Sequence, residues 1–151
     1  MLNRYRLLCC TLMLCTLHFC VVAGAVPPEL VAERLTTEYA QNPLTVSGPH
    51  PRFSWNLTSG QRGARQTAYE LVVGRSEAEV RKGQGGEWQS GKTPSGDNLH
   101  IAYAGKPLQP FTRYYWSVQV YDAAGQASGW SAPAFFETAA LQPSDWKGEW
   151  I

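Results

Sequence analysis

The stretch that decides the fold class is LQPFTRYYWSVQVYD, residues 108–122. Its large apolar side chains recur at every second position, which is the period of a β-strand with two different faces. One face carries Tyr114, Trp116, Val118 and Val120, and the other carries Tyr115, Ser117, Gln119 and Tyr121. Because aromatic and β-branched residues dominate the stretch, we expect it to form a central strand of a β-sheet.

Shorter runs of the same kind lie on both sides of this stretch and are separated by turn-forming residues. We expect strands at residues 34–38, 52–57, 66–75, 87–91, 99–103 and in a last run through 130–138. One helical turn is expected at residues 76–82, where Ser76 can cap its start. Short strands at regular spacing without a long helix predict an all-β fold, an antiparallel β-sandwich of about seven strands. The predicted core anchors are Phe53, Trp55, Tyr69, Tyr114, Trp116 and Trp130.

The first 25 residues differ from the rest of the chain. Two arginines precede an apolar run over residues 7–22, and the small residues Ala23-Gly24-Ala25 follow. This order predicts a signal peptide at 1–25, a linker at 26–32, and export to the periplasm or the extracellular space. The alternative is an uncleaved membrane anchor, and we expect a membrane association only in that case. All four cysteines lie in this leader, so the domain must fold without disulfides.

Composition and charge argue against several functional classes. The formal net charge of the 151 residues is +1, and no run of basic residues forms an electrostatic footprint for nucleic acid. His50 and His100 stand alone, without a cysteine or a carboxylate cluster at metal-ligand spacing. We therefore expect no nucleic-acid partner, no metal and no cofactor.

The segment around Tyr114 resembles a fibronectin type III domain. The matching positions are Leu108, Pro110, Tyr114, Trp116, Val118, Val120, Asp122, Gly125, Ser128, Trp130-Ser131, Phe136 and Thr138. The resemblance implies an immunoglobulin-like sandwich in which the Tyr114 hydroxyl bonds back to the corner that precedes its strand.

A more specific resemblance covers residues 33–151 and is carried by short motifs in a fixed order. The motifs are Glu38 with Asn42-Pro43-Leu44, then 51–55 (PRFSW), 65–69 (RQTAY), Trp88 with Ser90-Gly91-Lys92, and Asp145-Trp146 with Trp150-Ile151. This series resembles the amino-terminal domain of the family 78 α-L-rhamnosidases. The resemblance implies a non-catalytic accessory domain at 33–140, followed at 141–151 by a linker and the start of a further domain.

The same resemblance implies where the chemistry of such an enzyme resides. In this family the catalytic carboxylates lie in a downstream (α/α)6 barrel, and no part of that barrel is in the sequence. We find no pair of carboxylates tied to a sugar pocket, so no catalytic residue is assigned and the chain alone is not expected to be an enzyme. The implied partners are the downstream domains of the same polypeptide.

Aromatic residues that we expect to face outward are the candidates for contact. They are Trp88, Tyr103, Tyr115, Tyr121, Trp146 and Trp150. The last two are expected at the junction with the following domain. The first four pack on that domain, stack on a rhamnose-containing carbohydrate, or are plain surface residues. The alternatives are a carbohydrate-binding module and a fibronectin-type interaction module of another secreted protein.

Overall fold

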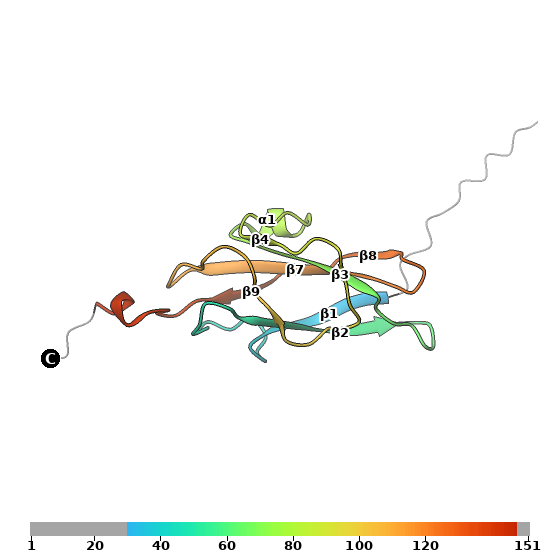
Figure 1. The fold of residues 1–151 in the computed structure, drawn as a ribbon, viewed down its shortest axis with the longest axis horizontal. Helices are drawn as coiled ribbons and strands as arrows, with labels where there is room; N and C mark the ends of the chain where they lie inside the picture. The colour runs from blue at the N-terminus through green and yellow to red at the C-terminus, as the bar shows by residue number, and fades with distance from the viewer. Residues whose placement is uncertain (1–29, 148–151) are drawn as a thin grey trace, which may run out of the picture.

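The computed structural model describes residues 30–147, and these form two sheets packed face to face (Figure 1). The smaller sheet has the order β1-β2-β6, with β1 at Leu30–Thr37, β2 at Arg52–Ser59 and β6 at Ile101–Ala102. The larger sheet has the order β4-β3-β7-β8, and β5 and β9 are attached to β3 and β7. Its strands are β3 (Ala68–Gly74), β4 (Trp88–Gln89), β5 (Thr93–Pro94), β7 (Arg113–Tyr121), β8 (Ala127–Trp130) and β9 (Ala134–Glu137). The pairings between these strands are all antiparallel, which confirms the predicted class of sandwich.

Strand β7 is the centre of the larger sheet, as its alternation predicts. It pairs with β3 along one edge and with both β8 and β9 along the other. Its inward face buries Tyr114, Trp116, Val118 and Val120 completely. These side chains meet the inward face of β2, where the Phe53 ring lies 4.5 Å from the Trp116 ring between centroids. Aromatic pairs of this kind add about 0.5–1.5 kcal/mol beyond the area they bury.

Several bounds differ from the predictions: β4 and β6 are shorter than expected, and β5 was not expected at all. Strand β1 begins at Leu30, inside the predicted linker at 26–32, because Leu30 and Ala32 are buried core residues that pair with β2. The last predicted run is two strands, β8 and β9, on the same edge of β7. Pro133 lies between them and has no N–H to donate to the ladder, so the edge is interrupted there.

The outer face of the larger sheet is partly covered by the helical turn α1 (Glu77–Val80), which confirms the turn expected at 76–82. Its cap is Ser76, whose side chain accepts from the Glu79 N–H. The prediction that Trp130 anchors the core is wrong. Trp130 is half-buried and lies against Gly83, in the segment after α1.

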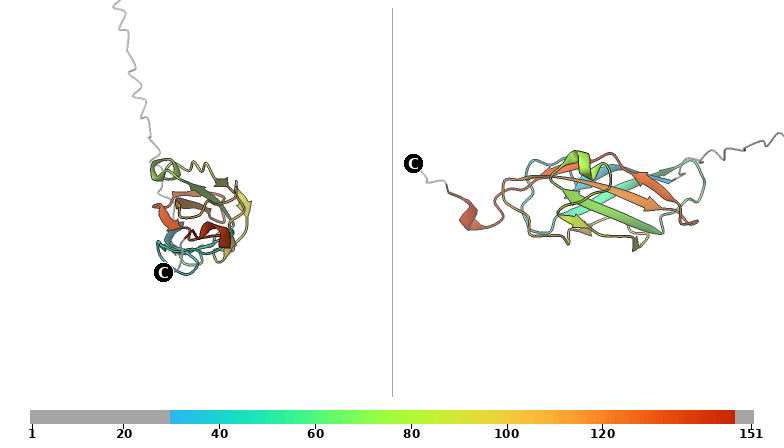
Figure 2. Two further views of the ribbon diagram at one scale, coloured as in Figure 1. Left: turned by 90° about the vertical axis from the view of Figure 1, so that its left-hand side faces the viewer. Right: turned by 90° about the horizontal axis from the view of Figure 1, so that it is seen from above.

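The two ends of the sandwich carry different parts of the chain (Figures 1 and 2). Strand β1 begins at one end, and the chain leaves β9 at the other, where three loops meet. We call this second end the C-terminal end and define it by residues 38–51, 103–112 and 138–147. Backbone contacts join these loops: Val46 bridges to Thr138, and the Phe111 N–H donates to the Ala139 carbonyl at 3.3 Å.

Candidate functional site

Exposed apolar side chains gather at the C-terminal end. In residues 30–147 the exposed large hydrophobic side chains are Val31, Tyr39, Leu44, Leu99, Phe111 and Trp146. All except Val31 and Leu99 belong to the loops of the C-terminal end. Contiguous exposed apolar patches are common at contact surfaces, whereas single exposed apolar residues are usually scattered.

Phe111 and Trp146 line an apolar groove at this end. Each of the two side chains is 63% exposed. The groove has a volume of about 580 Å³, and its other lining residues are Pro110, Ser144, Asp145 and Lys147. Trp146, which was predicted to lie at a junction with a following domain, lines this groove, while Trp150 lies outside the described residues.

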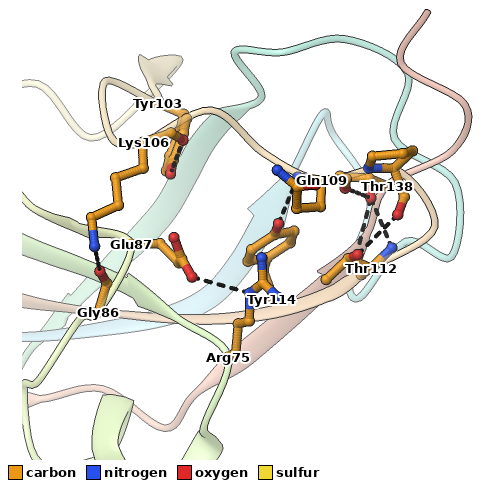
Figure 3. A network of polar contacts seen from close by, with 10 residues as sticks. Arg75, Gly86, Glu87, Tyr103, Lys106, Gln109, Thr112, Tyr114 and Thr138 are labelled. Atoms are coloured by element: carbon orange, nitrogen blue, oxygen red, sulfur yellow. Dashed lines mark hydrogen bonds and ion pairs between the residues drawn. The ribbon is translucent and has the colours of Figure 1, made fainter.

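One wall of the groove is held by a polar network beneath the loop at 109–112 (Figure 3). The Gln109 N–H donates to the Tyr114 hydroxyl at 2.8 Å, and the Thr138 hydroxyl donates to the Gln109 carbonyl at 2.6 Å. The Thr112 N–H donates to the same Thr138 oxygen at 2.9 Å. These bonds fix the loop on both sides of Phe111, whose φ of 52° lies in the left-handed region. The bond that the resemblance implies for Tyr114 is confirmed.

The other wall is held by a short 3₁₀ turn, η1 (Pro143–Asp145). The Asp145 carboxylate accepts the N–H groups of Leu141 and Gln142 at 2.9 and 2.8 Å. Leu141 packs against the hydrophobic core, so the turn is anchored to the sandwich. Trp146 follows directly and is thereby held at the mouth of the groove. Sequence reasoning singled out the Asp145-Trp146 motif, and the structure gives Asp145 a positioning role.

Two predicted contact residues face the core instead of the solvent. Tyr103 is 2% exposed, and its hydroxyl donates to the Lys106 carbonyl at 2.7 Å. Trp88 is half-buried, with its ring stacked 6.3 Å from Phe53 and edge-on to Tyr103 at 5.4 Å. The prediction that these two face outward is wrong, because Trp88 in the edge strand β4 and Tyr103 directly after the edge strand β6 close the gap between the sheets. Burial raises the pKa of Tyr103 to about 12.

Tyr115 and Tyr121 do lie partly exposed on the outer face of the larger sheet, and neither lines the groove. The Lys92 ammonium sits 3.8 Å from the centre of the Tyr121 ring, and the Tyr121 hydroxyl donates to Glu70 at 2.9 Å. A sugar that stacked on this face of Tyr121 would have to displace Lys92. Burial and the neighbouring Glu70 carboxylate raise the pKa of Tyr121. The Tyr115 ring instead lies beside Phe135, at 6.3 Å between ring centroids. The predicted contact residues therefore do not form one site.

A second cluster, which begins at Glu38 and Tyr39 in the C-terminal end and extends to Arg52 and His100 beside it, was missed by sequence reasoning. The Arg52 guanidinium bonds both carboxylate oxygens of Glu38, at 3.2 and 2.7 Å, and lies 5.2 Å from the centre of the Tyr39 ring. Tyr39 also meets His100 edge-on at 5.1 Å. The hydrogen bonds from Arg52 lower the pKa of Glu38, so the pair stays charged at neutral pH. The sequence did contain a signal for this ion pair, since Glu38 and Arg52 carry opposite charges and both belong to the series of motifs.

Two carboxylates of the C-terminal end are already engaged within the domain. Glu38 is paired with Arg52, and the Asp145 carboxylate is used by backbone N–H groups. Across residues 30–147, His, Cys, Asp and Glu side chains nowhere gather in groups of three that could hold a metal ion. A search of the same residues for a long apolar helix able to cross a membrane found none.

Comparisons with known proteins agree with this reading of the fold. A family model described as "Rha78A-like, N-terminal immunoglobulin domain" matches residues 32–142. The chain is 46% identical over 116 residues to an α-L-rhamnosidase of Streptomyces avermitilis, a match that covers 77% of this chain and 11% of that protein. It thus spans about a tenth of the length of this relative.

Solved structures give the same result. The crystal structure of the Streptomyces avermitilis α-L-rhamnosidase complexed with L-rhamnose matches with a TM-score of 0.76 and 44% identity, over 81% of this chain and 12% of that one. The α-L-rhamnosidase of Dictyoglumus thermophilum matches with a TM-score of 0.75 and 35% identity, over 80% of this chain and 14% of that one. The matched part is the immunoglobulin domain, which is itself non-catalytic. The chain therefore belongs to the Rha78A-like N-terminal immunoglobulin domains, a family that α-L-rhamnosidases carry.

Proposed function

We propose that this chain is the amino-terminal accessory domain of a longer, exported α-L-rhamnosidase, and that it braces the catalytic part through its C-terminal end. The observation that carries the proposal is the family match over residues 32–142, in a chain that corresponds to 11% of its rhamnosidase relative. The hydrolysis of terminal rhamnose from glycosides or polysaccharides would then be the work of the downstream part, with this domain acting on its stability and position.

The distribution of exposed apolar side chains supports a brace that acts through one end. Tyr39, Leu44, Phe111 and Trp146 all lie on loops of the C-terminal end, where the chain leaves β9. Interfaces between domains of one chain are built from such surfaces, with charged groups at the rim. The Glu38–Arg52 pair, whose side chains are partly exposed, fits the place of a rim group.

The proposed export rests on the leader at residues 1–25. Cleavage after Ala25 would leave Val26 as the first residue of the mature protein. Amino-terminal sequencing of the protein recovered from the periplasm or the culture medium tests this point. A mature protein that still begins at Met1 and sediments with membranes would favour the anchored alternative.

The proposed function is tested first by reading the gene beyond the codon for Ile151 and expressing the longer product. We expect that product to hydrolyse an aryl α-L-rhamnoside and the 151-residue chain to leave the same substrate intact. A stop codon directly after Ile151, or a longer product without rhamnosidase activity, would contradict the proposal.

Sugar binding is the second candidate function, and the exposed indole of Trp146 beside Phe111 is the observation in its favour. Paired aromatic rings at a groove can stack on the faces of sugars. Titration with a rhamnose-containing polysaccharide should then quench tryptophan fluorescence, and the quenching should be lost in Trp146→Ser. A flat titration would remove this candidate and leave the brace.

A further inference from the structure

We propose that the groove between Phe111 and Trp146 seats an apolar side chain from the downstream part of the same polypeptide, and so sets the angle between the two parts. This inference rests on the proposed function in one respect, since it requires a longer polypeptide. It goes further by naming the groove as the contact site, an apolar side chain as its occupant, and the residues that hold the groove open.

The first argument is that the groove is preformed. Phe111 has a φ of 52°, a conformation that a bulky residue adopts only where its surroundings impose it. The surroundings here are Tyr114 and Thr138, which are 0% and 3% exposed and fix the loop by hydrogen bonds on both sides of Phe111. The domain thus holds an apolar ring in a strained conformation and presents it to solvent. Strain of this kind collects at sites that bind something.

The second argument concerns what the ring contributes to the domain itself. The Phe111 side chain is 63% exposed, so it adds little to the core of the isolated sandwich. Trp146 is exposed to the same extent on the opposite wall. Phe111 and Trp146 both line the groove, and exposed apolar side chains gain free energy when an apolar group displaces the water that covers them.

The third argument identifies the occupant. The second wall consists of residues 144–147, so the polypeptide that continues from Lys147 starts at the groove itself. A tethered group has a high effective concentration, which lets a small contact form without a large interface. A second copy of this chain has no such advantage, because stable interfaces between separate proteins use roughly 20–30 residues a side and six residues line this groove.

The experiment uses the longer polypeptide and measures the rate of tryptic cleavage after Lys147, a lining residue that an occupied groove protects. The variant is Phe111→Ser, and the matched control is Leu99→Ser, an apolar residue of 60% exposure on another part of the surface. Phe111→Leu is the conservative variant. We expect the wild type, L99S and F111L to be protected and F111S to be cut about tenfold faster or more, since cleavage follows the population of the open state.

Equal cleavage rates in the wild type and F111S would overturn the inference, provided circular dichroism shows that both are folded. Rhamnosidase activity of the same preparation separates this failure from failure of the proposed function. If the longer product is active but Lys147 is cleaved rapidly, only the groove inference is contradicted. If Lys147 is protected but the product has no rhamnosidase activity, only the proposed function is contradicted. Dimerisation of the 151-residue chain that F111S abolishes would also overturn the inference, because the occupant would then be a second copy.

Discussion

The hydroxyl of Tyr114 accepts a hydrogen bond from the backbone N–H of Gln109 at 2.8 Å and so ties the first residues of β7 to the corner before it. The Tyr114 side chain is completely buried, and its ring stacks on Phe136 at 5.4 Å. A residue of the core therefore fixes a loop of the surface. Because Phe111 lies on that loop, the core of the sandwich sets the position of one wall of the groove.

Replacement of Tyr114 by phenylalanine should lower the free energy of unfolding by about 0.5–1.5 kcal/mol, because the partly buried hydrogen bond from the Gln109 N–H is lost while the ring packing is kept. Urea unfolding of the described domain measures the change. Tyr115→Phe is the matched control, since the Tyr115 hydroxyl has no backbone partner among the hydrogen bonds of residues 30–147 and should change stability little. Equal effects of the two substitutions would mean that the corner bond contributes nothing.

Gly83→Ala should destabilise the domain more than Gly91→Ala. Both glycines have positive φ, 76° and 63°, so both substitutions meet backbone strain of about 1–2 kcal/mol. A Cβ at Gly83 would also lie 2.2 Å from the Trp130 ring, whereas nothing lies within 4 Å of a Cβ at Gly91. The clash should add about 1–3 kcal/mol, and Trp130 fluorescence should change only in G83A. Equal destabilisation by the two substitutions would show that the Trp130 ring moves away from the added Cβ at no cost in stability.

The Glu38–Arg52 pair should make stability depend on acid pH. The hydrogen bonds from Arg52 hold the pKa of Glu38 below its ordinary value of 4.5, so the native state favours the charged form. The contribution is complete above pH 4.5 and is lost as the pH falls through the lower pKa of the folded state. Wild type should exceed Glu38→Gln in urea midpoint at pH 7, and the difference should vanish at low pH and shrink in high salt. A difference that is constant with pH would contradict this assignment.

Tyr103 should limit stability on the alkaline side. Burial raises its pKa from 10.0 to about 12, so the unfolded state loses the proton first. Its contribution is complete below pH 10 and is lost as the pH rises towards 12. The slope of stability against pH above 10, measured by urea unfolding, should be shallower in Tyr103→Phe than in wild type. The slopes are compared rather than the absolute values, because Y103F also loses the bond to Lys106.

How far sequence alone predicts this molecule depends on the length of each element. Strand β7 is long enough for its alternation to assign both faces, and its buried face was predicted residue by residue. The segments β4 and β6 have two residues each, and a period of two cannot be read from two residues. The inward orientation of Trp88 and Tyr103 comes from closing the edge of the sandwich, which is a tertiary effect.

The groove was only half predictable for a related reason. Trp146 was identified through its motif, next to the residue that positions it. Phe111 was not identified, because a phenylalanine side chain gives no sign that its backbone is left-handed. Its conformation is imposed by Tyr114 and by Thr138, which lies 27 positions further along the chain. An apolar residue directly after Pro110 in a corner loop was the available signal.

Phe111→Gly should separate the stability of the domain from its use as a brace. Glycine adopts a positive φ without steric cost, so the isolated domain should keep or gain stability, by up to about 1 kcal/mol, although a ring is removed. In the longer polypeptide the same substitution should lower the thermal midpoint, because the groove loses a wall and the downstream contact with it. Calorimetry of both forms measures the two effects, and Leu99→Gly serves as control. Opposite signs in the two forms are expected only if the strain at Phe111 is maintained for a contact outside the sandwich. A loss of similar size in both would instead make Phe111 an ordinary stabilising residue of the corner.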